Sequence, residues 1–174
     1  MEKIFYTNAT EFPNSDAFVL YLLKKYYGKA SATISRNENG KPFLDAPLFF
    51  SVSHTKTYLF VAFSKENIGI DAEIVNRKTE FQTIIKKFPP LERKEILTQQ
   101  DFLRHWTVRE SAIKWLGGSI AKDLTKLSFY NGKLKYGNVE LPVQLSFLNL
   151  ANHFLCVCSE RDFSKVEILS IITN

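Results

Sequence analysis

The chain has 174 residues, of which 45% are hydrophobic and 24% are charged, and these proportions are ordinary for one domain or for two small intertwined halves. The formal net charge is +5, but the basic residues are dispersed and no nucleic-acid-binding motif is present, so we expect no nucleic-acid partner. We also expect no membrane partner and no secretory signal, because no apolar run fits either. The only two cysteines, Cys156 and Cys158, give no disulfide framework and predict a cytoplasmic protein.

The first half of the chain is expected to contain one helix followed by strands. The helix covers residues 15–27, which Asn14 or Ser15 could cap and Gly28 would end. A polar turn follows around the dipeptide Asn39-Gly40. Three apolar runs then predict buried strands that form an antiparallel meander. These strands are 48–53, 57–63 and 68–74.

The second half repeats this plan loosely. Helices are expected at about 80–87, from Pro90 toward Leu97, and at 100–116, and strands at 126–130, 133–136, 142–148 and 153–159. The order predicts an α+β fold of two pseudo-duplicated halves, each with helices packed on an antiparallel meander. The halves are residues 1–75 and 76–174, and they form one globular unit. A faint similarity between the segments HTKTYLFVAFS and LANHFLCVCSE suggests an internal repeat.

Two carboxylates lie in the strand expected at 68–74. Side chains alternate along a strand, so Asp71 and Glu73 share one face with their Cα atoms about 6.5–7 Å apart. Both carboxylates could therefore reach one hard divalent cation such as Mg²⁺. The alternative is a solvated strand face that is paired with lysines.

The segment FLRHWTVRESAIKWLGG is expected to form the long helix. Glu110 and Lys114 are four residues apart on a partly shielded border of its apolar stripe, where they could form an ordinary helix ion pair. Arg109 falls within the stripe, and a charged residue there should meet an acidic group or a phosphate.

The segment FFSVSHT ends a predicted strand with Ser53 and His54 at the start of a turn. A hydroxyl, an imidazole and exposed backbone amides at such a corner suit anion binding, although a lone histidine is more often structural. The sequence contains no G-x-S-x-G elbow, Walker A loop or dinucleotide fingerprint.

Five motifs in this order resemble the 4′-phosphopantetheinyl transferases, and in particular their longer, pseudo-dimeric Sfp-like branch. The motifs are NGKPFL (39–44), FSVSHT (50–55), IGIDAE (68–73), FPPLE (88–92) and WTVRESAIKWLGG (106–118). The resemblance implies a Mg²⁺-dependent enzyme, with Mn²⁺ as an alternative ion. Such an enzyme moves the phosphopantetheine arm of coenzyme A to a serine of an apo acyl or peptidyl carrier protein and releases 3′,5′-ADP.

The resemblance also implies roles for individual residues. The metal ligands would be Asp71, Glu73 and Glu110. Lys114 would contact the coenzyme A phosphates and act in catalysis, and Glu92 would be the general base, directly or through water. The remaining coenzyme A contacts would be Ser53 and His54 at the phosphates and Gly40, Lys41 and Pro42 at the adenine.

The sequence departs from the family pattern in two places. Arg109 stands where the family usually has lysine, and the basic residues that usually hold the 3′-phosphate have no clear match; Lys24, Lys25 or Arg36 could substitute. The alternative function is a catalytically degenerate module that binds coenzyme A or a carrier protein. The resemblance further leads us to expect a monomer, with the active site between the two halves.

Overall fold

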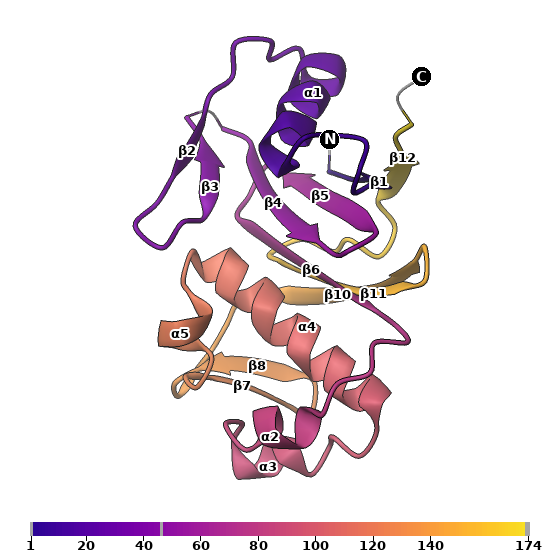
Figure 1. The fold of residues 1–174 in the computed structure, drawn as a ribbon. Helices are drawn as coiled ribbons and strands as arrows, with labels where there is room; N and C mark the ends of the chain where they lie inside the picture. The colour runs from indigo at the N-terminus through magenta and orange to yellow at the C-terminus, as the bar shows by residue number, and fades with distance from the viewer. Residues whose placement is uncertain (1, 46, 173–174) are drawn as a thin grey trace.

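The computed structural model describes residues 2–45 and 47–172 (Figure 1). Its strands are β1 (Lys3–Asn8), β2 (Ile34–Arg36), β3 (Pro42–Leu44), β4 (Phe49–His54), β5 (Tyr58–Ser64), β6 (Ile68–Ile74), β7 (Leu127–Tyr130), β8 (Lys133–Tyr136), β9 (Val139–Glu140), β10 (Gln144–Leu150), β11 (His153–Ser159) and β12 (Glu167–Ser170). Its helices are α1 (Ser15–Tyr27), α2 (Phe81–Ile85), α3 (Pro90–Arg93), α4 (Gln99–Leu116) and α5 (Ile120–Asp123). None of the helices in these described ranges combines the length and the apolar character needed to cross a membrane.

The strands form two principal sheets and two smaller ones. One principal sheet has the order β12-β1-β5-β4, and the other has the order β10-β11-β6. The smaller sheets are the hairpin β2-β3 and the three short strands β7-β8-β9. All neighbouring strands are antiparallel except β1 and β12, which run parallel. The mixture of helices and largely antiparallel sheets confirms the predicted α+β class.

The predicted meanders are wrong. Strand β6 does not pair with β5 but with β11, where Asp71 lies opposite Cys156. The hydroxyls of Ser51 and Ser53 on β4 instead accept the amide N–H groups of Ile70 and Ala72, each at 3.0 Å. These hydroxyls satisfy amides on the edge of β6 that does not face β11, so β4 and β6 lie side by side without a backbone ladder.

Strands of the two halves of the chain are exchanged between the sheets. The last strand, β12, returns to pair with β1, and β6 joins the sheet of β10 and β11. In the second half, β8 pairs with β9 and β10 pairs with β11, so the expected four-strand meander is split in two. A division at residue 75 therefore does not separate one sheet from another.

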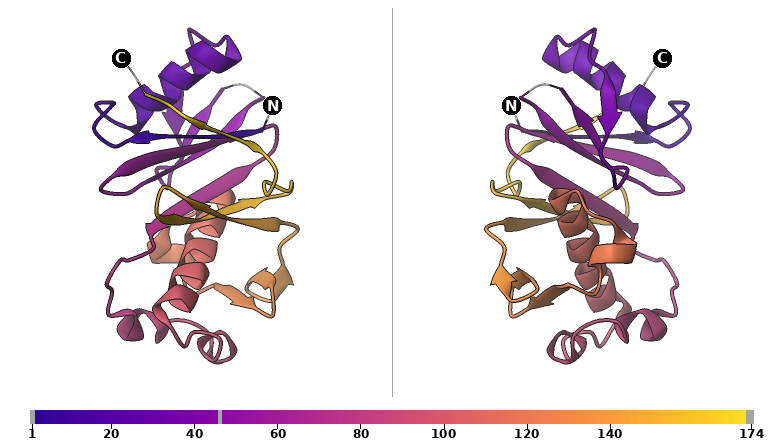
Figure 2. Two further views of the ribbon diagram at one scale, coloured as in Figure 1. Left: turned by 90° about the vertical axis from the view of Figure 1, so that its right-hand side faces the viewer. Right: turned by 90° about the vertical axis from the view of Figure 1, so that its left-hand side faces the viewer.

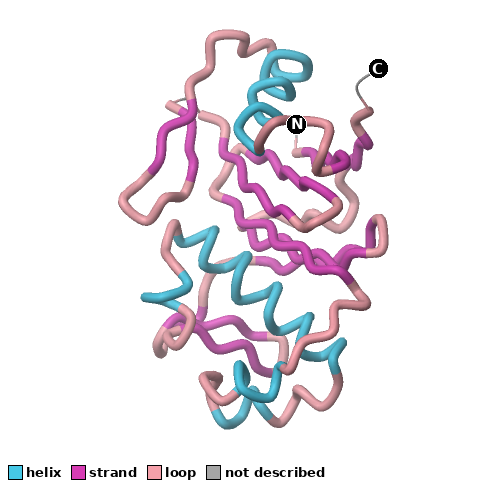
Figure 3. Tube along the Cα trace, viewed as in Figure 1, coloured by secondary structure: helices cyan, strands magenta, loops and turns pink. Residues whose placement is uncertain are grey.

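The layers are held together by alternating apolar side chains. Phe5 and Phe63 of the β1-β5 pair face α1, whereas Ile4 and Phe60 face the sheet that contains β6. Helix α4 covers the opposite face of that second sheet and also packs on β7. The side views show this order of layers, and Figure 3 shows α4 running between β6, β10 and β11 on one side and β7 and β8 on the other (Figures 2 and 3).

Helix α4 begins and ends as the sequence predicts. Thr98 and Asp101 form a capping box at its start, and Gly117 ends it with a φ of 67°. The helix lies directly on β6 because Gly69 has no side chain: a Cβ there would stand 1.9 Å from the carbonyl oxygen of Ser111. This close approach places α4 against the strand that carries Asp71 and Glu73.

Candidate functional site

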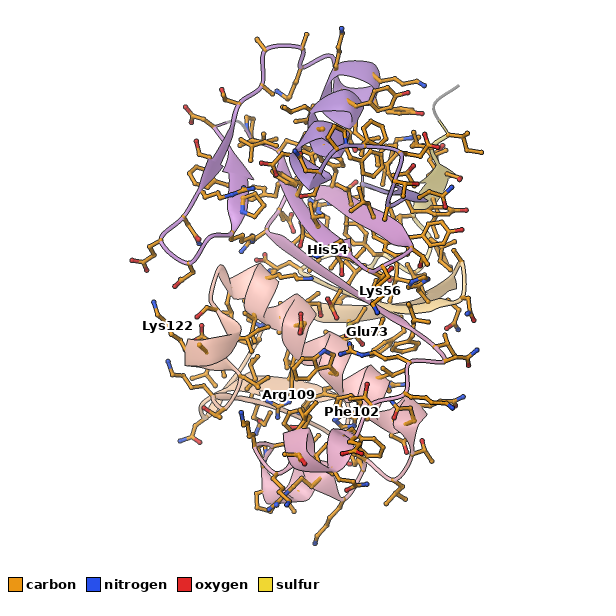
Figure 4. The ribbon with its side chains drawn as sticks, in the orientation of Figure 1. His54, Lys56, Glu73, Phe102, Arg109 and Lys122 are labelled. Carbon is orange, nitrogen blue, oxygen red and sulfur yellow. The ribbon has the colours of Figure 1, made fainter. Side chains whose placement is uncertain are left out.

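A cavity of about 1000 Å³ lies where β4, β6 and α4 meet. Six of the predicted site residues line it: Ser53, His54, Asp71, Glu73, Glu110 and Lys114. Figure 4 shows that His54, Lys56 and Glu73 lie on the side of α4 that faces β4 and β6. The fold thus brings residues from three separate segments of the sequence into one site.

Asp71 lies at the centre of the polar contacts in this cavity. Its Oδ1 accepts hydrogen bonds from Nζ of Lys114 at 2.8 Å and from Oγ of Ser53 at 3.1 Å. The ammonium group of Lys114 also donates to the carbonyl of Ile70 at 2.9 Å. The second oxygen, Oδ2, is buried and has no hydrogen-bond partner among the described residues. A buried carboxylate oxygen without a partner is unfavourable, so this atom suits a bound cation or donor.

Glu73 and Glu110 add two further carboxylates. Oε1 of Glu73 lies 2.5 Å from a guanidinium nitrogen of Arg77. The carboxylate of Glu110 accepts no hydrogen bond from the residues that the structure describes. Burial raises the pKa of Glu110 to about 7, and the charges of Asp71 and, less strongly, Glu73 add to this effect, whereas Lys114 opposes it. Burial and the neighbouring carboxylates thus both disfavour a negative charge on Glu110 in this arrangement.

The three carboxylates of Asp71, Glu73 and Glu110 are the type of ligand that a hard divalent ion binds. Oxygen ligands are what Mg²⁺ prefers, and Oδ2 of Asp71 is buried without a partner. Within the described ranges, no three histidine, cysteine or acidic side chains stand in a ready-made metal cluster. In this arrangement the other oxygen of Asp71 is bound to Lys114, and Glu73 is bound to Arg77. An ion would compete with those two cationic side chains for the carboxylates.

The Gly40-Lys41-Pro42 turn lies apart from this cavity. Lys41 and Pro42 line a second hollow of about 300 Å³, which shares no lining residue with the first. Nζ of Lys41 donates to Asn67 Oδ1 at 2.9 Å and approaches the carbonyl oxygen of Trp115 at 3.5 Å. Burial lowers the pKa of Lys41 to about 8. Gly40 has a φ of 84°, as the turn predicted from Asn39-Gly40 requires.

Glu92 is not brought to the cavity. Its side chain is 0% exposed, and its carboxylate is bound to Arg109, to His105 Nδ1 and to the backbone amide of Phe129. Burial alone would raise the pKa of Glu92, but the hydrogen bonds from His105 and Arg109 and the charge of Arg109 lower it. This placement does not support the role of general base that the resemblance implies.

The position of Arg109 in the helix predicts an acidic group or a phosphate as its partner, and the partner is the acid Glu92. His105, which completes the buried cluster, is not identified from the sequence. It precedes Arg109 by four residues and so lies on the same face of α4. That spacing is the signal from which it could have been found.

The cavity also has basic residues that the sequence does not single out. Lys56, Arg77 and Lys78 line it. Lys56 follows His54 by two residues in the same turn, and Arg77 follows Glu73 by four, so both are close in sequence to predicted site residues. By contrast, Lys24, Lys25 and Arg36 do not line the cavity, and the guanidinium of Arg36 is bound to Asp16.

Comparison with known proteins gives this geometry a family. The model of the 4′-phosphopantetheinyl transferase superfamily matches residues 67–159, which is more than half of the chain. The chain belongs to the 4′-phosphopantetheinyl transferase superfamily. The matched range includes both carboxylates of β6 and all of α4, which carries Glu110 and Lys114.

Curated relatives agree with this family. The chain is 30% identical over 153 residues to the 4′-phosphopantetheinyl transferase gsp of Aneurinibacillus migulanus, and the match covers 78% of this chain and 61% of that relative. It is 29% identical over 143 residues to the 4′-phosphopantetheinyl transferase Sfp of Bacillus subtilis, covering 73% of this chain and 61% of Sfp. A shorter match to the 4′-phosphopantetheinyl transferase HetI of Nostoc sp. is 30% identical over 91 residues and covers 48% of this chain and 38% of HetI. This superfamily member therefore spans less than two thirds of the length of each of these relatives.

Proposed function

We propose that this chain transfers the 4′-phosphopantetheine arm of coenzyme A to a serine of an apo acyl or peptidyl carrier protein and releases 3′,5′-ADP. The observation that carries the proposal is the single cavity in which Asp71 and Glu73 of β6 meet Glu110 and Lys114 of α4. The names of the relatives and the matched family support the same reaction.

Asp71, Glu73 and Glu110 are the residues that would hold Mg²⁺ or Mn²⁺. A bound ion would supply positive charge that stabilises the negative charge developing on the leaving phosphate. The support for this assignment is the oxygen donor set and the partnerless Oδ2 of Asp71. Ser53 would keep the other oxygen of Asp71 in place through its hydroxyl.

The basic groups of the cavity would hold the phosphates. Nζ of Lys114 is fixed by Asp71 and the carbonyl of Ile70, and from there it would donate to phosphate oxygens and offer a proton to the departing phosphate. His54 is exposed at the end of β4, where it would contact the phosphates of coenzyme A together with Lys56. Ser53 could reach a phosphate only if its hydroxyl left Asp71.

The hollow beside the Gly40-Lys41-Pro42 turn would receive the adenine of coenzyme A. Pro42 and Phe43 supply apolar surface there, and Trp115 closes the side toward α4. We further propose a cytoplasmic monomer whose two pseudo-duplicated halves enclose the site. The net charge of +5 would favour an acidic carrier protein as partner.

The test is incubation of this chain with coenzyme A, Mg²⁺ and a panel of apo carrier proteins, followed by intact-protein mass spectrometry. We expect at least one carrier to gain the mass of one phosphopantetheine, with an equal amount of 3′,5′-ADP released. If none of several acyl and peptidyl carriers gains mass while Sfp modifies them in parallel, the proposal is wrong.

A module that binds coenzyme A or carrier protein without turnover is the second candidate. The arrangement of the carboxylates weighs against it, because binding alone does not need three acids beside Lys114. Calorimetric titration with coenzyme A separates the two: binding without any mass gain on a carrier would favour the module.

A further inference from the structure

The carboxylate of Glu92 has no free acceptor position for a further hydrogen bond. Oε1 accepts hydrogen bonds from His105 Nδ1 and Arg109 Nε, each at 3.0 Å. Oε2 accepts from a terminal nitrogen of Arg109 at 2.5 Å and from the amide of Phe129 at 2.9 Å. A carboxylate has about four acceptor positions, so all of them are occupied by donors of the protein.

The guanidinium of Arg109 is also buried and bonded on several sides. It is 0% exposed, and besides its two bonds to Glu92 it donates to the carbonyl of Leu124 at 2.5 Å. Its guanidinium carbon lies 3.8 Å from the centre of the Phe88 ring. The pair therefore connects α4 to α3 and to the segment that leads from α5 into β7. A buried, bidentate pair of this kind is rigid in geometry.

The pair lies on the opposite side of α4 from the cavity. Figure 4 shows Arg109 on the side of β7 and β8, away from His54 and Glu73. Glu92 lines a separate hollow of about 310 Å³ with residues of β7 and β8, but its side chain is 0% exposed there. Successive helix residues are turned by about 100°, so anchoring Arg109 inward fixes the direction in which Glu110, the next residue, leaves the helix.

We propose that Glu92 is a positioning residue, which pairs with Arg109 to hold α4 in the rotation that presents Glu110 and Lys114 to the cavity, and that it does not take the proton of the carrier serine. The inference rests on the proposed transferase function. Glu92 then has a structural role in the active site, and the proton of the carrier serine goes to a group that reaches the cavity.

The test is a cycle of Glu92→Gln, Arg109→Gln and the double variant, measured for thermal unfolding and for phosphopantetheine transfer. Each single variant leaves one buried charge without its partner, so we expect the Tm to fall by roughly 10 °C. The double variant removes both charges while its amides can still bond the groups around them, so its Tm and its transfer rate should exceed those of Glu92→Gln. We expect its rate to lie within about tenfold of the wild type, with the wild-type dependence on pH.

A general base would behave differently. Glutamine cannot accept a proton, so Glu92→Gln and the double variant would then both lose about 10²–10⁴-fold in rate, and removing Arg109 would restore nothing. Such a loss of rate in both variants would overturn the proposal. A double variant that does not fold would also overturn it, as would a Glu92→Gln protein as stable as the wild type. Single variants that do not fold beside an active double variant would support it.

The exposed pair Lys133–Glu140 provides a matched control, because both side chains are more than half exposed. The corresponding cycle of glutamine variants should change the Tm and the rate little. The wild-type protein in the same assay separates the two proposals. If it transfers nothing, the proposed function fails, whereas the coupling in Tm still tests whether Glu92 and Arg109 act as a unit.

Discussion

Two serines of β4 make similar contacts with β6, but only one of them touches a carboxylate of the site. Ser51 and Ser53 each accept one β6 amide at 3.0 Å. Ser53 also donates to Oδ1 of Asp71 at 3.1 Å. Ser53 thus links the framework of the sheets to the residue at the centre of the cavity, and Ser51 does not.

We predict that Ser53→Ala weakens the binding of Mn²⁺ by about 10–100-fold, because the groups that orient a ligand contribute to metal affinity on that scale. Titration followed by the electron paramagnetic resonance of free Mn²⁺ measures this affinity without any turnover. Ser51→Ala is the matched control. It should lower the free energy of unfolding by about 1–3 kcal/mol, as Ser53→Ala does, because each leaves a buried amide unpaired, but it should keep the wild-type affinity. Equal affinities in the two variants would contradict the role of Ser53.

At the scale of residues, the sequence predicts the members of the site better than their contacts. Spacing alone brings Asp71 and Glu73 to one strand face and Glu110 and Lys114 to one helix border. The helical pattern also predicts that Arg109 meets an acidic group or a phosphate, and its partner is an acid. The pattern cannot say that Glu92 is this acid, because the partner comes from another element and is chosen by tertiary packing.

At the scale of elements, the contact between α4 and β6 depends on Gly69. A Cβ at this position would stand 1.9 Å from the Ser111 carbonyl oxygen and 2.6 Å from the Trp115 nitrogen. Both are backbone atoms of α4, which cannot move aside without moving the helix. The absence of a side chain at Gly69 therefore allows the short distance between β6, with Asp71 and Glu73, and α4, with Glu110.

We predict that Gly69→Ala costs about 3 kcal/mol of the free energy of unfolding, at the upper end for overpacking, and that it weakens Mn²⁺ binding. Gly132→Ala is the control: apart from its neighbours in the chain, no atom of the described residues lies within 4 Å of an added Cβ, and only its φ of 72° is unfavourable, at about 1–2 kcal/mol. Urea unfolding and the Mn²⁺ titration check both. If Gly69→Ala binds Mn²⁺ like the wild type, the close contact does not set the site.

Local signals predict helices well where caps are present. The helix over 15–27 is found with its Asn14 cap and its Gly28 end, as expected. Helices α2 and α3 are shorter than predicted: α2 ends at Ile85, ahead of Pro89 and Pro90, and α3 ends at Arg93 and does not run toward Leu97. Strand β12 is not predicted, since a four-residue edge strand has little periodicity to recognise.

At the scale of the whole molecule, the exchange of strands joins the two halves of the sequence. The pairing of β6 with β11 and of β12 with β1 could not be read from the sequence, because an apolar strand can satisfy either neighbour. Strand β1 occupies the edge of β5 that the expected meander would have left to β6, and Ser51 and Ser53 occupy amides of β6 on the side of β4.

We predict that this exchange makes thermal unfolding a single cooperative transition, with equal calorimetric and van't Hoff enthalpies. Each half depends on a strand from the other, so neither should melt first. Differential scanning calorimetry of the full chain measures this directly. Two separate transitions would contradict the prediction and would favour independent halves divided near residue 75.

The central claim is that phosphopantetheine transfer takes place in the cavity of Asp71 and Glu110. The most direct test is the intact mass of an apo carrier protein after incubation with coenzyme A, Mg²⁺ and either the wild-type chain, Asp71→Asn or Glu110→Gln. We predict one added phosphopantetheine with the wild type and none with either variant, although both variants remain folded. A carrier that is fully modified by either variant would contradict the claim.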